Sequence, residues 1–203
     1  MDQRIAEIVK RIGELEEDLQ RELTEAGDRF GYHFDKGKAR FERSAIAAQR
    51  QLRRTLFRFI AEADWLVALT APVIYSLIVP LALLDLFITI YQRVCFPIYG
   101  VDIVRRGEYV VVDRHRLAYL NLLEKLNCAY CGYGNGVIAY AREIAARTER
   151  YWCGIKHAKR VKGAHRYYYD YPDYGDAEGY RENEKKIGEK RIRNFKRQGD
   201  SDD

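Results

Sequence analysis

The chain has 203 residues and a formal net charge of +5 at pH 7, which allows one or two small folding units and excludes a large enzyme. The excess of basic residues is concentrated in a few segments, so we expect an anionic partner. Beside a long apolar segment, anionic membrane lipid is a simpler partner than nucleic acid, and we predict no nucleic-acid binding.

A charged helical arm is predicted over residues 1–64. Within it, residues 3–26 place apolar side chains three and four positions apart, which predicts a helix with a coiled-coil seam. The seam consists of Ile5, Ile8, Ile12, Leu15 and Leu19. Such a seam favours self-association, and the alternative is a helix that packs on its own chain. Glycines and aspartates from Gly27 to Gly37 then predict a break.

A second helix, rich in basic residues, is predicted from about Lys38 to Asp64. Four of its arginines are the candidate lipid-binding residues: Arg50, Arg53, Arg54 and Arg58. A basic amphipathic helix that leads into an apolar insert is expected to lie in the headgroup plane of a membrane. The alternative is the solvated face of a helix in a bundle.

Residues 65–91 form the predicted membrane insert, in which Asp85 is the only charged side chain. As one helix they would measure about 40 Å against a hydrocarbon core of about 30 Å, which suits one crossing and not two. Trp65 and Tyr91 bracket the segment as interfacial aromatic residues do. Two arrangements stay open, a single span kinked at Pro80 and a re-entrant insert that turns there. Asp85 either pairs with an arginine or lies near the interface, and its position toward the C-terminal end favours the interface.

Arginines flank the insert on both sides, and no signal-peptide pattern precedes it. Cytoplasmic flanks collect Lys and Arg, and a heavily charged arm is costly to translocate. We therefore expect the N- and C-terminal regions to face the cytoplasm, which favours the re-entrant arrangement. The four cysteines would then lie in a reducing compartment, where they are metal ligands, redox groups or packing residues.

Residues 92–181 are predicted to form a cytoplasmic helical domain that carries the cysteines. It begins with a turn-prone connector around Cys95, and Glu108–Val112 is short and β-branched, which predicts a small strand or an extended segment. A polar tail over residues 182–203 is expected to be disordered, with at most a marginal helix over 184–197.

A helical hairpin is predicted inside this domain. Asp113 is the expected N-cap of a helix over 114–127. The glycine-rich stretch Cys128–Gly136 predicts a loop, and the apolar spacing over 137–152 predicts a second helix. Two helices joined by a short loop would lie antiparallel.

The sharpest local motif is Cys128-x-x-Cys131-Gly-Tyr. It resembles the metal-binding knuckles of rubredoxins and of HNH nucleases, in which two thiolates turn toward one metal. Residues 132–152 contain no histidine, so the resemblance does not extend to the nuclease core.

Cys153 and His157 would complete a Cys3His set with this motif, suited to zinc, with iron as the alternative. An unbroken helix over 137–152 would separate its ends by about 24 Å, which requires a broken helix, a site shared by two chains, or two clusters. In the last case Cys95 would join Cys153 and His157 near the membrane. A redox dithiol and structurally buried cysteines are the remaining alternatives.

Three stretches resemble a group of small bacterial membrane proteins to which no activity is assigned. They are VCFPIYG, the segment from DRHRLAYLNLLEKLNCAYCGYGNG to EIAARTERYWCGIKHA, and YGDAEGY. The resemblance spans roughly residues 90 to 181 and implies a bacterial cytoplasmic membrane as the setting, without implying a reaction.

The order of these parts predicts a mainly α, membrane-associated protein. We predict a metal-stabilised adaptor or assembly protein without catalytic residues, which forms a homo-oligomer or binds a membrane protein partner. The alternative is a membrane-bound redox protein or enzyme that uses thiolate-bound iron or the CxxC dithiol.

Overall fold

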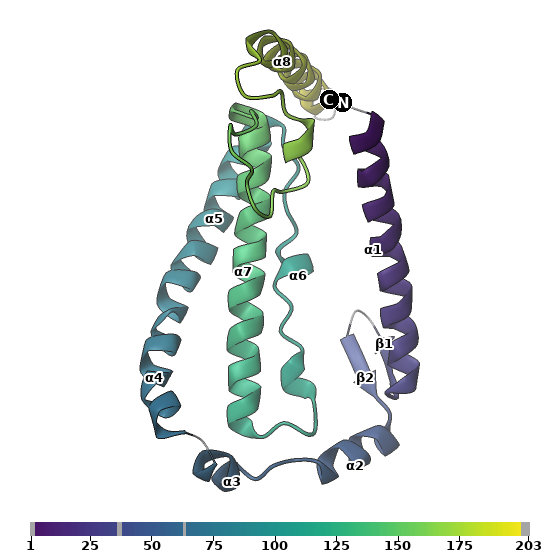
Figure 1. Cartoon of the computed structure of the whole chain (residues 1–203), viewed down its shortest axis with the longest axis vertical. Helices are drawn as coiled ribbons and strands as arrows, with labels where there is room; N and C mark the ends of the chain where they lie inside the picture. The colour runs from purple at the N-terminus through teal and green to yellow at the C-terminus, as the bar shows by residue number, and fades with distance from the viewer. Residues whose placement is uncertain (1–2, 36–37, 63, 200–203) are drawn as a thin grey trace. The chain divides into compact units, whose positions relative to one another are not determined.

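The structure, a computed structural model, describes residues 3–35, 38–62 and 64–199 (Figure 1). It is mainly helical, which confirms the predicted fold class. The chain divides into two compact units. The first unit contains Met1–Ile78 and Val111–Gly134, and the second contains Val79–Val110 and Asn135–Asp203.

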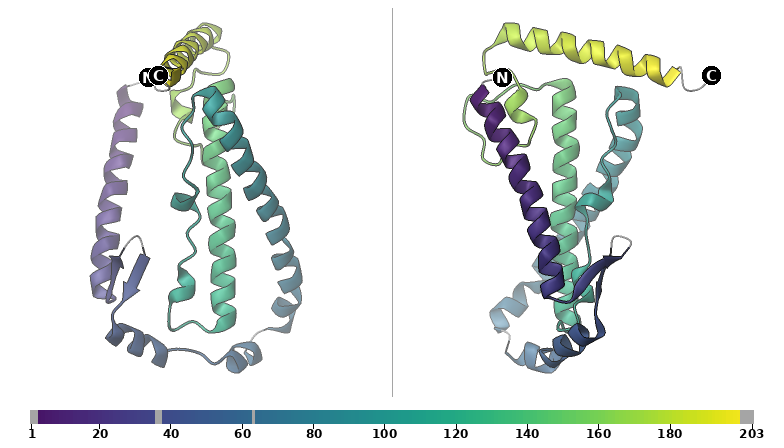
Figure 2. Two further views of the ribbon diagram at one scale, coloured as in Figure 1. Left: turned by 180° about the vertical axis from the view of Figure 1, so that it is seen from behind. Right: turned by 90° about the vertical axis from the view of Figure 1, so that its right-hand side faces the viewer.

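The first unit begins with helix α1 (Gln3–Arg29), followed by an antiparallel hairpin of β1 (Tyr32–Asp35) and β2 (Lys38–Phe41). Figure 2 shows the hairpin beside the C-terminal end of α1. Gly31 turns the chain between them with a φ of 66°, a conformation that other residues rarely adopt. The predicted break after residue 26 therefore contains a small sheet. The aromatic rings of Tyr32 and Phe41 pair across its two strands with their centroids 5.3 Å apart, which stabilises the hairpin.

The single basic helix predicted over 38–64 is wrong. Strand β2 takes its first residues, and the rest is divided into α2 (Arg43–Gln51) and α3 (Leu56–Ala61). The interruption falls where Arg50, Arg53 and Arg54 would lie three and four positions apart on one helix, and such like-charge neighbours destabilise a helix. Helix α4 (Trp65–Ser76) follows, and the side chain of Asp64 caps it by accepting a hydrogen bond from the Leu66 N–H at 2.9 Å.

The predicted helix over 114–127 and the loop over 128–136 are also wrong. Residues Arg114–Arg116 form one turn of 3-10 helix, η1, and the long helix α7 (Leu122–Trp152) then runs through the glycine-rich stretch without a break. Asn121, not Asp113, is the cap. Its Oδ1 accepts from the N–H groups of Leu123 and Glu124 at 3.0 Å each, and Glu124 Oε2 accepts from the Asn121 N–H at 2.8 Å. This is a reciprocal capping box, which fixes the start of α7.

Within the first unit, two tyrosines tie the beginning of α7 to α4. Tyr130 Oη donates to the carbonyl of Ile74 at 2.6 Å, and Tyr75 Oη donates to Asn127 Oδ1. The two tyrosine rings also meet edge to face at 5.5 Å, an arrangement that aromatic pairs prefer. Hydrogen-bonded phenols on two helices thus hold the N-terminal part of α7 against α4.

The second unit is built on α5 (Ile78–Tyr99), which Gly100 ends with a φ of 65°. The Val101 N–H donates to the Phe96 carbonyl at 2.9 Å, which closes the last turn. Cys95 therefore lies inside a helix and not in a connector. The following residues, called the extended segment below, have no regular secondary structure apart from the short helix α6 (Arg106–Tyr109). The small strand predicted over Glu108–Val112 is therefore wrong, and the extended alternative does not hold for Glu108 and Tyr109, which belong to α6.

The core of the second unit consists of Phe96, Val104, Tyr140 and Ile144. Gln92, also buried, connects α5 to the extended segment. Its Oε1 accepts from the Val104 N–H at 2.9 Å and its Nε2 donates to the Val104 carbonyl at 3.2 Å, so one side chain satisfies both backbone groups of a residue outside any sheet.

Glycines make the close packing of this segment on α7 possible. In the second unit, a Cβ on Gly136 would lie 2.7 Å from both the Tyr109 carbonyl oxygen and the Val110 Cα. In the first unit, a Cβ on Gly132 would lie 3.2 Å from the Val111 carbonyl oxygen. The glycines that indicated a loop are therefore the contact points of backbone against helix.

The C-terminal part of the second unit contains one turn of 3-10 helix, η2 (Tyr168–Asp170), and helix α8 (Ala177–Gly199). Where the tail over 182–203 is expected to be disordered, the structure continues α8 to Gly199, and residues 200–203 lie outside the described residues.

One helix among the described residues, Ala68–Tyr99, is long and apolar enough to cross a membrane. Pro80 lies in the first turn of α5, where a proline costs little, so the turn on which the re-entrant arrangement was based is not found there. The departure from regular helix is at Leu77, between α4 and α5. The pairing alternative for Asp85 is the one observed, because Arg106 holds its carboxylate with two hydrogen bonds of 2.9 and 2.6 Å.

Candidate functional site

The structure does not bring the predicted metal ligands together. Cys95 lies on α5, Cys128 and Cys131 lie on α7 in the first unit, and Cys153 follows α7 in the second. No disulfide joins these four cysteines, and the described residues contain no group of three or more His, Cys, Asp or Glu that could hold a metal. His157 instead stacks on the Tyr168 ring at 5.8 Å.

Helix α7 is the physical reason for this separation. It continues without interruption through the Cys128–Cys131 motif and ends at Trp152, just before Cys153. The rise between Cys131 and the end of the helix is about 30 Å, far beyond the reach of one zinc ion. Cys128 and Cys131 lie on one side of the helix, as residues three apart do. The zinc and iron hypotheses stay predictions, and a single-chain Cys3His site does not fit the described residues.

The four candidate lipid-binding arginines are all exposed, but they divide into two kinds. Arg54 and Arg58 pair with Glu62, the first at 3.5 Å and the second at 2.7 Å. Arg50 and Arg53 line a hollow in the first unit that holds no described acidic side chain. The structure therefore distinguishes Arg54 and Arg58, which are paired with Glu62, from Arg50 and Arg53, although the sequence pattern does not distinguish them.

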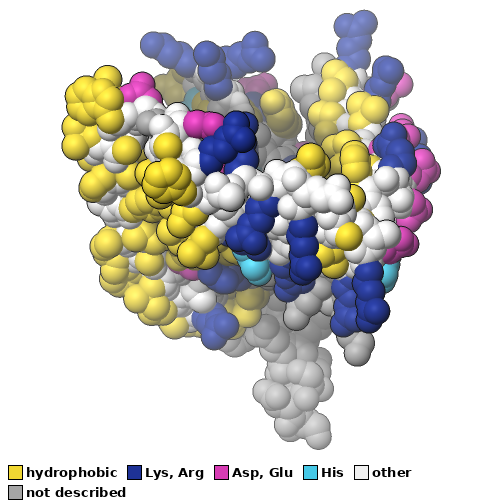
Figure 3. All heavy atoms as spheres, turned by 90° about the horizontal axis from the view of Figure 1, so that it is seen from below, with side chains coloured by type: hydrophobic (Ala, Val, Ile, Leu, Met, Phe, Trp, Pro, Cys, Tyr) yellow, Lys and Arg dark blue, Asp and Glu magenta, His cyan; other side chains and the backbone are white. Residues whose placement is uncertain are grey.

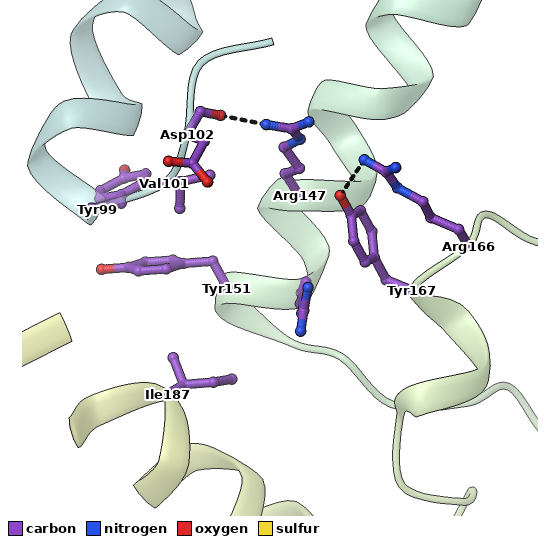
Figure 4. A pocket seen from close by; sticks show the side chains of 10 residues that line it. Tyr99, Val101, Asp102, Arg147, Tyr151, Arg166, Tyr167 and Ile187 are labelled. Atoms are coloured by element: carbon purple, nitrogen blue, oxygen red, sulfur yellow. Dashed lines mark hydrogen bonds between the residues drawn. The ribbon is translucent and has the colours of Figure 1, made fainter. Parts of the chain in front are cut away.

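A second hollow, of about 300 Å³, lies in the second unit and is called the arginine–tyrosine pocket below (Figure 4). It lies where the end of α5, the end of α7, the segment around Arg166 and helix α8 meet. Its lining residues are Tyr99, Gly100, Val101, Asp102, Arg147, Arg150, Tyr151, Arg166, Tyr167 and Ile187.

Two of its arginines are fixed by one carboxylate on α7. Glu143 Oε1 accepts from Arg147 at 2.8 Å, from Arg166 at 2.5 Å and from the Tyr167 hydroxyl at 3.1 Å. Burial raises the pKa of Glu143, but the hydrogen bonds from Arg147 and Tyr167 and the charge of Arg166 outweigh it and hold that pKa below its ordinary value. Arg147 also donates to the Asp102 carbonyl at 2.7 Å. The carboxylate thus orients the wall of the pocket.

Aromatic rings supply the rest of the pocket. Tyr99 and Tyr151 stack at 4.6 Å. Arg150 and Arg166 lie over the ring of Tyr167 at 4.9 and 4.8 Å, which are cation–π distances. The pocket presents guanidinium and phenol donors beside flat aromatic surface.

The tyrosine-rich run from Arg166 to Arg181, for which the sequence predicts no role, folds back on the end of α7. Tyr171 is buried against Gly154, and burial raises the pKa of the Tyr171 phenol well above its ordinary value. His165 Nε2 lies 2.8 Å from Glu149 Oε2 on α7. Tyr171 therefore anchors the run on the second unit, while Tyr169 and Tyr174 stay exposed.

Sequence analysis missed the pocket residues. The spacing of Glu143 and Arg147, four positions apart, is a recognisable ion-pair signal on a helix. Arg166 and Tyr167 gave no such signal, because their partner is more than twenty positions away. Comparison of the chain with profiles of known protein families, with curated proteins and with solved structures gave no significant match.

Proposed function

We propose that the protein is a membrane-bound adaptor that self-associates and performs no catalysis. The observation that supports this proposal is the amount of apolar surface left uncovered on its long helices. Exposed apolar patches larger than those of ordinary soluble proteins mark surfaces that contact a membrane or another protein.

Helix α5 has two chemically different sides. One side carries Asp85 and Gln92, whose polar atoms are bound within the second unit. The other side carries large apolar residues that are each more than half exposed, namely Leu86, Phe87, Ile90 and Val94. Transfer of the exposed parts of these four side chains into hydrocarbon is favourable by about 3–6 kcal/mol, because complete burial of one such side chain contributes about 1.5–3 kcal/mol. This side supports contact of α5 with lipid.

Helix α1 supports self-association. Its seam residues Ile8, Ile12, Leu15 and Leu19 are each more than half exposed. In a parallel pair of such helices, Arg11 of one copy would lie beside Glu16 of the other, because these residues take the flanking g and e positions of the heptad. The spacing of the apolar residues and the order of the charged residues both favour a second copy of the chain as the partner of α1.

The test measures membrane attachment and assembly separately. Membranes of cells that express the full chain are washed with alkaline carbonate, and the mass of the detergent-purified protein is measured by light scattering. We expect the protein to remain in the membrane pellet as an oligomer. The variant I12D/L19D should stay in the pellet and lose assembly, because it places charges in the seam.

The matched control is K10D/E17D, which changes two residues of α1 outside the seam and should keep the oligomer. Release of the wild-type protein by carbonate would overturn the membrane part of the proposal. An unchanged mass for I12D/L19D would overturn the self-association part.

A further inference from the structure

The first unit contains a hollow of about 380 Å³, called the basic hollow below. It lies between strand β2, helix α2, the segment after η1 and the first turn of α7. Its lining residues are Ala39, Phe41, Ile46, Arg50, Arg53, Arg116, Ala118 and Lys125.

Four cations meet in the basic hollow from segments that are far apart in the chain. Arg50 and Arg53 come from the end of α2 and the residues after it, while Arg116 and Lys125 come from η1 and α7. A hydrogen bond from the Ala118 N–H to Gln49 Oε1 at 3.2 Å holds the two segments together. The fold therefore assembles a positive site that no single stretch of sequence displays.

These cations have no counter-charge in the part of the chain that the structure describes. None of the four forms an ion pair with a described residue, and no described acidic side chain lines the basic hollow. Arg54 and Arg58, only a few positions away, are paired with Glu62. Assembled like charges repel one another, so the basic hollow is complementary to an anion.

The surroundings of the basic hollow are apolar. Phe41 and Ile46 line it, and Leu52 and Phe57, on the adjoining α2–α3 stretch, are 77% and 84% exposed. Figure 3 looks onto this side of the first unit and shows Lys and Arg side chains beside hydrophobic ones. A free phosphate would contact only the cations, whereas a lipid would contact both kinds of surface.

We propose that the basic hollow binds the phosphate of an anionic lipid headgroup. The three arginines donate to the phosphate oxygens in forked pairs and Lys125 supplies a further positive charge. Leu52 and Phe57 enter the adjoining acyl region. This inference rests on the proposed membrane attachment and adds a specific lipid class to it.

The test uses the full chain in neutral detergent, titrated with short-chain phosphatidic acid, with phosphatidylcholine of the same chain length, and with glycerol 3-phosphate. Binding is measured by calorimetry. The variant R50Q/R116Q removes two cations of the basic hollow. The matched control R54Q/R58Q removes two cations that are paired with Glu62, so both variants lose the same net charge.

We expect R50Q/R116Q to weaken binding of phosphatidic acid about 30-fold, because each cation near an anionic surface contributes about fivefold to the affinity. R54Q/R58Q should weaken this binding less than about threefold. The single variant K125Q, on a different element, should weaken it about fivefold. Circular dichroism establishes that each variant is folded.

Equal effects of the two double variants would overturn the inference, because they would show diffuse attraction. Glycerol 3-phosphate that binds as tightly as phosphatidic acid would also overturn it, since the ligand would then be a soluble phosphate. Either result leaves membrane attachment intact if the wild-type chain stays in the carbonate pellet. Release by carbonate is the separate failure of the proposed function.

Discussion

Replacing Gly136 with alanine should destabilise the protein, although alanine is the better helix former. In a helix interior this change normally stabilises by about 1 kcal/mol. Here the new Cβ would lie 2.7 Å from two backbone atoms of the extended segment, the Tyr109 carbonyl oxygen and the Val110 Cα. Neither can turn away as a side chain would, so the segment has to move.

The expected cost follows from these opposing terms. Overpacking of a tight site costs about 1–3 kcal/mol. Two backbone atoms at 2.7 Å put this site in the upper part of that range, at about 2–3 kcal/mol, so the net loss after the gain in helix propensity is about 1–2 kcal/mol. For a chain of this size each kcal/mol corresponds to about 2–4 °C. Thermal unfolding of the purified protein in detergent, followed by near-UV circular dichroism, measures the change.

Gly188 on α8 provides the matched control, because a Cβ there would meet nothing within 4 Å. Gly188→Ala should leave the melting temperature unchanged or raise it, because the better helix former adds up to about 1 kcal/mol to the free energy of unfolding. A Gly136→Ala variant that is as stable as wild type, or more stable, would refute the close packing of the extended segment on α7.

Three further predictions concern the polar contacts of the second unit. Gln92→Leu should lower the free energy of unfolding by about 2–4 kcal/mol, because it leaves two buried backbone groups of Val104 unsatisfied; a loss below about 1 kcal/mol in the same thermal assay would contradict this account. Asp85→Asn should destabilise by about 1.5–3 kcal/mol by leaving Arg106 without its counter-charge, and the double variant D85N/R106Q should recover part of that loss in a double-mutant cycle. Because the pKa of Glu143 is held below 4.5, its contribution is present above that pH and lost as the pH falls through the folded-state pKa. The stability difference between wild type and Glu143→Gln should therefore be constant near neutral pH and become smaller as the pH falls into the acid range, and a difference that does not decrease with falling pH would contradict the assignment.

Some predictions that depended on local pattern agree with the structure, whereas the helices predicted in the same way over 38–64 and 114–127 do not. Asp85 is the only charged residue in the run from Trp65 to Tyr91, and most of that run lies within the candidate membrane helix Ala68–Tyr99. The heptad spacing predicted the helix that is observed as α1. The apolar spacing over 137–152 predicted a helix that ends at Trp152, where α7 ends. Each of these signals comes from residues within a few turns of one another.

The loop predicted from Gly132 and Gly136 was also wrong, and Pro80 lies in the first turn of α5. Gly132 and Gly136 have the same sequence signature in a loop as in a helix against which another backbone packs. Pro80 can turn a chain or begin a helix. The cysteine motif was expected in a loop and lies on the continuous helix α7, and metal binding by these thiols stays a prediction.

The sequence by itself determined the mainly α class, the apolar segment and the heptad seam, because the spacing of apolar side chains along the chain specifies these features. Only the tertiary structure decided which arginines are paired, which glycines contact backbone and which partner holds Asp85. The pairing of Asp85 with Arg106 joins residues 21 positions apart, and the basic hollow joins Arg50 to Lys125. Such contacts depend on the path of the chain between their partners, which residue spacing alone does not specify.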